Sequence, residues 1–170
     1  REHNVSLEVS VSPDMPAGMV LDETRLRQVL FNLVGNAIKF THEGGVTVRA
    51  EVAAMESRGD DEFCRLSIAV TDTGIGIADD QRERIFDAFE QQEGQSSRKY
   101  GGTGLGLAIS RKLAHMMGGE LNVDSVPGQG STFILVLPEV QVVPMEDDTG
   151  DEPEVNRAPM TETLDMQERS

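Results

Sequence analysis

The chain has 170 residues and a formal net charge of −15, which argues against a nucleic-acid-binding protein, because such proteins need a basic surface to neutralise phosphates. Apolar residues make up 38% of the chain and aromatic residues only 4%, so aliphatic side chains must fill the core. The single cysteine, Cys64, excludes an intramolecular disulfide, and the three histidines are too scattered to form a metal site.

The first predicted element is a half-buried strand over residues 3–12, where apolar and polar side chains alternate. A proline-containing turn over residues 13–18 ends this strand. Apolar residues at helical spacing then predict a helix from about 23 to 41, and we expect the segment Glu43-Gly44-Gly45 to end it.

A β-hairpin is predicted next, because two strand-like stretches, 46–55 and 63–71, flank a polar turn at 57–62. After the hairpin we expect, in order, a short helix over 79–89, a polar loop over 90–100, a second long helix over 105–117 and two closing strands over 120–125 and 131–137. We expect Gly118-Gly119 to end the second long helix. These elements predict an α+β sandwich whose mixed or antiparallel sheet carries its helices on one face.

The last part of the chain, residues 139–170, has ten acidic and two basic residues and few bulky apolar ones. Such a composition buries too little surface to offset chain entropy. We therefore expect one domain over 1–138 and a disordered tail or linker over 139–170. No stretch approaches 18 consecutive apolar residues and no signal peptide opens the chain, so we expect a cytoplasmic location without direct membrane contact, compatible with a parent protein anchored in the inner membrane.

Three polar motifs interrupt these elements, and each has a structural and a functional interpretation. Asn32, Asn36 and Lys39 lie on one stripe of the first helix, because their spacing is i, i+4 and i+7. Asparagine is a mediocre helix former, so the stripe is either a solvated face or a ligand site. In the second interpretation the Asn36 amide oxygen binds Mg²⁺, which takes oxygen ligands, and Lys39 offsets phosphate charge.

The second motif, Asp72-Thr-Gly74-Ile-Gly76, directly follows a predicted strand. A tight turn would explain it, since Asp accepts local backbone hydrogen bonds and Gly adopts positive φ. Alternatively, a partly buried Asp72 carboxylate accepts from the exocyclic amine of adenine, while the two glycines let the ring approach the backbone. Because a carboxylate only accepts, this interpretation favours ATP over GTP.

The third motif precedes the second long helix and is rich in glycine. It is not a dinucleotide fingerprint, since Leu107 stands where the last glycine belongs, and the chain has no P-loop. A flexible loop with a helix cap would explain it, but free N–H groups at a helix start also favour phosphate. Arg98 and Lys99, just upstream, support phosphate binding in an acidic protein. The motif consists of Gly101, Gly102, Thr103, Gly104, Leu105 and Gly106.

In this order and spacing the motifs resemble the catalytic and ATP-binding domain of bacterial sensor histidine kinases, in the superfamily shared with DNA gyrase B, Hsp90 and MutL. The resemblance covers about residues 5–138 and rests on five boxes, at 26–41, 72–76, 84–89, 102–109 and 130–133. It implies a two-layer sandwich of the Bergerat type with a mixed, mostly antiparallel sheet.

The resemblance also implies roles for matching residues. Asn36 would hold Mg²⁺, with Asn32 nearby and Lys39 on the phosphates, so Asn36 and Lys39 are the expected catalytic residues. Adenine and the phosphates would be bound by Asp72, Gly74, Gly76, Ile77, Phe89, Arg98, Lys99, Gly102, Thr103, Gly104, Leu105, Gly106 and Thr132. The loop over 90–104 is expected to close as a lid, which Phe86 and Phe89 anchor.

The implied function is transfer of the γ-phosphoryl of Mg²⁺-ATP to a histidine. Asn32 stands where the gyrase-like ATPases carry a glutamate base, and an amide takes no proton at neutral pH, so transfer to a nucleophile from another domain is favoured over hydrolysis. His3, His42 and His115 lie in no dimerisation motif, so we expect the acceptor histidine on a separate dimerisation domain absent from this chain.

The expected partners are therefore this phosphoacceptor domain and a response regulator or receiver domain, with the acidic tail as a linker toward a further domain, as in hybrid kinases. Two alternatives stay open. One is an autonomous ATPase of the gyrase or Hsp90 kind, which Asn32 disfavours. The other is a non-catalytic nucleotide sensor, which the intact motifs disfavour.

Overall fold

The computed structural model describes residues 4–87 and 106–144. The elements are, in chain order, β1 (Asn4–Val11), β2 (Gly18–Val20), α1 (Glu23–Phe40), β3 (Glu43–Arg58), β4 (Asp61–Asp72), the 3₁₀ turns η1 (Asp79–Gln81) and η2 (Arg84–Phe86), α3 (Gly106–Met116), β5 (Glu120–Val126) and β6 (Gly130–Val143). No helix in this described part is long and apolar enough to cross a bilayer.

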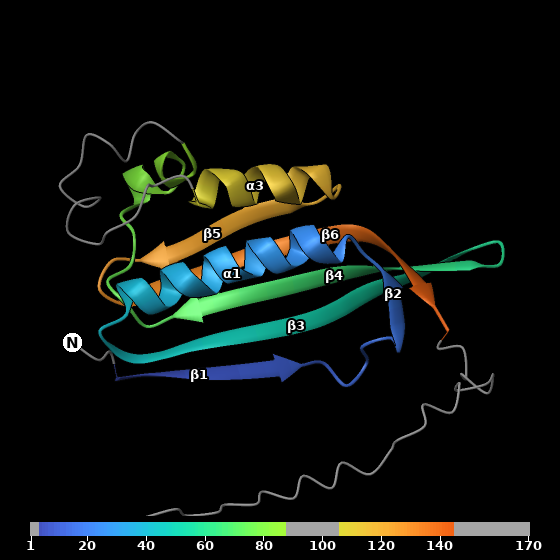
Figure 1. Cartoon of the computed structure of the whole chain (residues 1–170), viewed down its shortest axis with the longest axis horizontal. Helices are drawn as coiled ribbons and strands as arrows, with labels where there is room; N and C mark the ends of the chain where they lie inside the picture. Colours follow the sequence, from blue (N-terminus) through green and yellow to red (C-terminus); the bar gives the residue numbers. More distant parts are fainter. Residues whose placement is uncertain (1–3, 88–105, 145–170) are drawn as a thin grey trace, which may run out of the picture.

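The strands form one mixed sheet in the order β1-β3-β4-β6-β2, and β5 also pairs with β6. Only β1 and β3 run parallel; the other described pairs are antiparallel. Helices α1 and α3 lie together over one face of this sheet (Figure 1). The core lies between the two layers and includes Leu33 of α1, Val70 of β4 and Leu135 of β6. The predicted α+β class, with helices on one face, is confirmed.

Helix α1 begins with a side-chain cap, because Asp22 Oδ1 accepts from the Arg25 N–H at 3.1 Å. It ends at Phe40, earlier than the predicted glycine stop. The buried Thr41 hydroxyl donates to the Ala37 carbonyl at 2.7 Å, which satisfies one carbonyl of the last turn. Residues 43–45, predicted to end the helix, instead begin β3, so that expectation is wrong.

The predicted hairpin is confirmed as β3 and β4, but the strands reach Arg58 and Asp61, so the turn is tighter than expected. Strand β6 continues past Pro138 to Val143, beyond the predicted end at 137. A register irregularity between Cys64 and Leu66 of β4 lies opposite Pro138, and proline, which has no N–H, is tolerated at such irregularities. The division into a domain over 1–138 and a tail stays a prediction.

Two further elements differ from expectation. The short helix predicted over 79–89 is the pair of 3₁₀ turns η1 and η2 as far as the description extends. Strand β2, which pairs with the end of β6, was not predicted. Helix α3 agrees with its prediction, and the Gly118 N–H donates to the His115 carbonyl where the helix ends.

Strand β1 was expected to be half-buried, but its apolar side chains are largely exposed. Leu7, Val9 and Val11 are 53%, 69% and 57% exposed. They project on the helix-covered side, because they pair in register with Val46, Val48 and Ala50 of β3. Figure 1 shows the reason: β1 is the outer strand, beyond the reach of α1. The periodicity predicted the strand correctly and its burial wrongly.

Cys64 provides a direct test of this packing. Its thiol is 1% exposed, and burial raises its pKa. Because the thiolate is the reactive form, we expect Cys64 to be labelled by a thiol reagent at least about 100-fold more slowly in the folded protein than in urea. Labelling followed by mass spectrometry measures this ratio. Equal rates in both states would contradict the described core.

Candidate functional site

Asp72, the last residue of β4, is the buried acidic group around which the site is built. Its side chain lies on the helix-covered face with Val70, and the residue is only 6% exposed. Asp72 Oδ1 accepts from the Gly74 N–H at 2.9 Å. Burial raises the pKa of this carboxyl, and backbone hydrogen bonds from Gly74 and Ser131 partly oppose the rise. A carboxylate has more lone pairs than these bonds use, so it can accept from a ligand amine.

The loop after Asp72 packs on one side against the end of α1. A Cβ at Gly74 would lie 2.5 Å from the Phe40 carbonyl oxygen, so only glycine fits there. Thr73 fixes the same stretch to β3, because its N–H donates to the Gly45 carbonyl and its hydroxyl accepts from the Gly45 N–H at 3.0 Å. The loop is thereby held beside the end of α1 that carries Asn36 and Lys39.

On its other side the loop packs against the connection between β5 and β6. Gly76 has a φ of 72°, and a Cβ there would collide with the Val126 carbonyl. The Ile77 N–H donates to Ser125 Oγ at 2.7 Å, and this buried hydroxyl donates to the Gly130 carbonyl. The Asp72–Ile77 loop is therefore fixed from both sides. Sequence analysis missed Ser125, because an isolated serine in a strand carries no local signal.

Thr132 was expected to assist Asp72, and the structure corrects this. Thr132 pairs with Thr71, and their hydroxyl oxygens are 3.1 Å apart. Because side chains alternate along a strand, Thr132 projects on the face opposite Asp72. The residue paired with Asp72 is Ser131, which is buried and lies 2.8 Å from Ser125, oxygen to oxygen. The neighbour on the correct face is thus Ser131.

The polar stripe of α1 faces α3. Asn32 Nδ2 donates to Ser110 Oγ at 3.1 Å and to the Gly106 carbonyl at 3.4 Å. Asn36 and Lys39 follow on the same stripe and are half-buried. Among residues 4–87 and 106–144, neither side chain has a hydrogen bond or ion pair. Both groups are therefore available to a ligand.

The donor set fits a metal ion brought by a ligand better than one held by the protein alone. No group of three or more His, Cys, Asp or Glu side chains that could hold a metal exists in the described ranges. Mg²⁺ in nucleotide sites takes one or two protein oxygens, phosphate oxygens and waters. The free, half-buried amide of Asn36 fits such a role.

The turns η1 and η2 are fixed to the same edge of the sheet. Phe86 is buried, and its ring meets Phe133 edge-on at 6.2 Å between centroids. The Arg111 guanidinium of α3 lies 4.5 Å from the Phe86 ring centroid and 3.3 Å from a Glu83 carboxylate oxygen. The expected anchoring position of Phe86 is thus a core position, while its action on a lid stays a prediction.

The remaining predicted site residues lie outside the described ranges. Gly106, the first residue of α3, is the one member of the glycine-rich motif that the structure describes, and it contacts Asn32. The predicted site residues outside these ranges are Phe89, Arg98, Lys99, Gly102, Thr103, Gly104 and Leu105.

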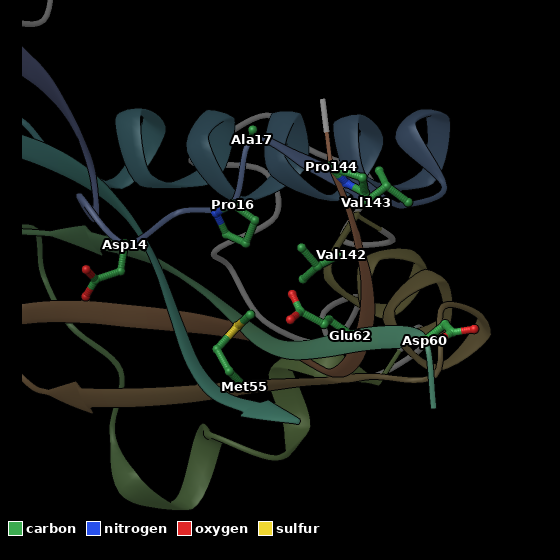
Figure 2. A pocket seen from close by; sticks show the side chains of 9 residues that line it. All are labelled: Asp14, Pro16, Ala17, Met55, Asp60, Glu62, Val142, Val143 and Pro144. Carbon is green, nitrogen blue, oxygen red and sulfur yellow. The ribbon is translucent and has the colours of Figure 1, made fainter. Parts of the chain in front are cut away.

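A separate hollow of about 490 Å³ lies between the β3–β4 hairpin and the ends of β2 and β6 (Figure 2). Three carboxylates line it, those of Asp14, Asp60 and Glu62, and none of its lining residues within the described part of the chain is basic. Glu62 and Asp72 stand at opposite ends of β4, about 30 Å apart at the usual rise of a strand. The hollow would repel a triphosphate, so it is not the nucleotide site.

Several known proteins are similar to this chain. The family model described as "Histidine kinase-, DNA gyrase B-, and HSP90-like ATPase" matches residues 21–141. The sensor histidine kinase AruS of Pseudomonas aeruginosa is 49% identical over 133 residues, which are 78% of this chain and 13% of that protein. The hybrid signal transduction histidine kinase F of Dictyostelium discoideum is 42% identical over 137 residues, 79% of this chain and 12% of that protein.

Among solved structures, that of full-length ShkA in complex with AMPPNP is similar, with a TM-score of 0.65 and 39% identity. The similarity covers 82% of this chain and 26% of that one. The chain therefore spans 13% of AruS, 12% of histidine kinase F and 26% of the ShkA chain.

Proposed function

The chain belongs to the family of histidine kinase-, DNA gyrase B- and HSP90-like ATPases, and on this premise we propose that it binds Mg²⁺-ATP and transfers the γ-phosphoryl to a histidine on a separate dimerisation domain. The observation that carries the proposal is the buried Asp72 carboxylate, held in a glycine-locked loop beside the free polar groups of α1. A buried carboxylate with acceptor capacity left over is expensive unless a ligand donor uses it.

Each described residue has a definite part in this proposal. Asp72 would accept from the adenine amine, and Gly74 and Gly76 would let the ring lie against the backbone. Asn36 would hold Mg²⁺, which supplies charge neutralisation on the phosphates, and the Lys39 ammonium would add to it. At the phosphates neither the Asn36 amide nor the Lys39 ammonium is a base that could activate water, and the Asp72 carboxylate would be occupied by the adenine amine. Positioning and charge stabilisation are therefore the chain's contribution, and the nucleophile comes from the partner.

The proposed partners follow from the proposal that another domain supplies the nucleophile. A phosphoacceptor domain would present the histidine, and a receiver domain or response regulator would take the phosphoryl group next. The similarity to a protein named a hybrid histidine kinase supports a receiver domain in the parent protein.

We expect the chain to label a separately purified dimerisation domain when [γ-³²P]ATP and Mg²⁺ are supplied, and Asn36→Ala to reduce the initial rate by at least about 100-fold. The reduction follows from losing the one protein ligand of the metal. Thr24→Ala, exposed in the first turn of α1, is the matched control and should label at the normal rate. Acid lability of the label identifies phosphohistidine.

Two outcomes would overturn parts of the proposal. Rapid steady hydrolysis of ATP by the chain alone would favour an autonomous ATPase. Normal labelling by Asn36→Ala would remove this residue from the site. Calorimetric titration with and without EDTA separates metal binding from nucleotide binding, since Asn36→Ala should abolish only the gain in ATP affinity that Mg²⁺ provides.

A further inference from the structure

The nucleotide-binding roles proposed above do not explain why the Asn32 side chain is hydrogen-bonded to α3. Ser110 lies on the inner face of α3 between Leu107 and Ala114, all three in the buried layer, and it is 0% exposed. An alanine would fill this position as well by packing alone. A buried hydroxyl costs free energy unless it is hydrogen-bonded, and its partner here is the Asn32 amide at 3.1 Å.

The Gly106 carbonyl determines which way this amide is turned. A carbonyl oxygen only accepts, so the Asn32 atom that faces it at 3.4 Å must be the donor Nδ2. Ser110 then accepts the second amide hydrogen. Both hydrogens of Nδ2 are thereby used, and no donor within the described ranges reaches Oδ1. The acceptor atom of Asn32 is left on the side away from α3, one helical turn before Asn36.

We propose that Ser110 is a positioning residue for nucleotide binding: its hydroxyl holds the Asn32 amide with Oδ1 presented as an acceptor beside Asn36, and it ties the first turn of α3 to α1. This inference rests on the proposed function. A flipped amide would present N–H groups beside Asn36, which would disfavour a cation held by the Asn36 amide oxygen. Ser110 acts through Asn32 and touches no reacting atom itself.

If Ser110 positions Asn32, loss of its hydroxyl should weaken binding of the phosphates and leave binding of the adenosine part unchanged. Asp72 and its loop contact β3, β5, β6 and the end of α1, but they share no hydrogen bond with Ser110 or Asn32. Removing the Ser110 hydroxyl should therefore weaken Mg²⁺-ATP about threefold to tenfold, which is the worth of one net hydrogen bond, and change adenosine affinity by less than about twofold. A role in helix packing alone would move neither affinity.

The test compares Ser110→Ala, Asn32→Ala and the double variant by calorimetry with Mg²⁺-ATP and with adenosine. In the unsubstituted protein, Ser110→Ala should weaken the binding of Mg²⁺-ATP. In the Asn32→Ala background, the same substitution should weaken binding further by less than about twofold, because the hydroxyl acts through that amide. Thr41→Val is the matched control. It removes another buried hydroxyl, bonded within α1 alone, and should leave both affinities unchanged.

A second readout needs no nucleotide. The Asn32 side-chain amide protons should exchange with solvent more slowly in the normal protein than in Ser110→Ala, as seen by ¹⁵N NMR. Unchanged Mg²⁺-ATP affinity in Ser110→Ala, or an equal loss in both backgrounds, would overturn the inference. Failure of the unsubstituted chain to bind any adenine nucleotide would instead overturn the proposed function, and the exchange measurement would still decide whether the Ser110–Asn32 bond forms.

Discussion

Asp72→Asn is expected to lower the affinity for ATP by about tenfold to a hundredfold without destabilising the fold. The loss corresponds to one hydrogen bond accepted by a charged group. Asparagine also places an amide donor where the adenine amine needs an acceptor, so the preference for ATP over GTP should narrow. Calorimetry with ATP and GTP measures both effects.

The stability part of this prediction follows from the pKa. Burial raises the pKa of Asp72 in the folded state, so the folded protein binds its proton more tightly than the unfolded chain does. Stability contributed by this group is present below the ordinary aspartate pKa and is lost as the pH rises through the raised value. Asp72→Asn should remove this slope, and at neutral pH its free energy of unfolding should be equal to or above that of the normal protein.

Asp60→Asn is the control, since Asp60 lies in the exposed turn between β3 and β4. It should leave the affinity for ATP unchanged. Urea unfolding at several pH values gives the stability curves. If Asp72→Asn bound ATP normally, or unfolded much more easily at neutral pH, the carboxylate would be a structural group rather than a ligand.

Gly76→Ala is the substitution expected to cost the most stability. Alanine at a φ of 72° is strained, and the new methyl group would meet the Val126 carbonyl, which belongs to backbone and cannot turn away. We expect a loss of about 3 kcal/mol or more in the free energy of unfolding. The Asp72 loop must shift to relieve the clash, so ATP affinity should fall as well.

Gly59→Ala is a closely matched control. Gly59 has a similar φ of 63° in the β3–β4 turn, but a Cβ there meets nothing within 4 Å. The free energy of unfolding of Gly59→Ala should fall only by the cost of alanine at a positive φ, about 1 kcal/mol, and the variant should bind ATP normally. Equal losses for the two variants in urea unfolding would show that the packing of the loop against the β5–β6 connection is wrong.

Local patterns in the sequence predicted most of the elements and singled out Asn32, Asn36, Lys39 and Asp72 as candidate site residues. The spacing of apolar residues in α1 follows from the helical period, and the same period places Asn32, Asn36 and Lys39 on one stripe. The Asp72 motif was recognisable because a carboxylate after a strand and next to two glycines can accept hydrogen bonds from a ligand that approaches the backbone, whatever the rest of the fold. These features depend on neighbours within a few residues, which the sequence displays directly.

Only the tertiary structure decided which side chains meet across the sheet and between the helices. A shift of one residue along a strand places a side chain on the opposite face of the sheet. The pairing of β4 with β6 therefore decides that Ser131, and not Thr132, lies on the same face as Asp72. Ser125 and Ser110 look like ordinary residues until the Ile77 N–H and the Asn32 amide reach them. Likewise, the exposure of β1 depends on where α1 lies. Burial and hydrogen bonding between distant segments are properties of the packed layers, and no local period encodes them.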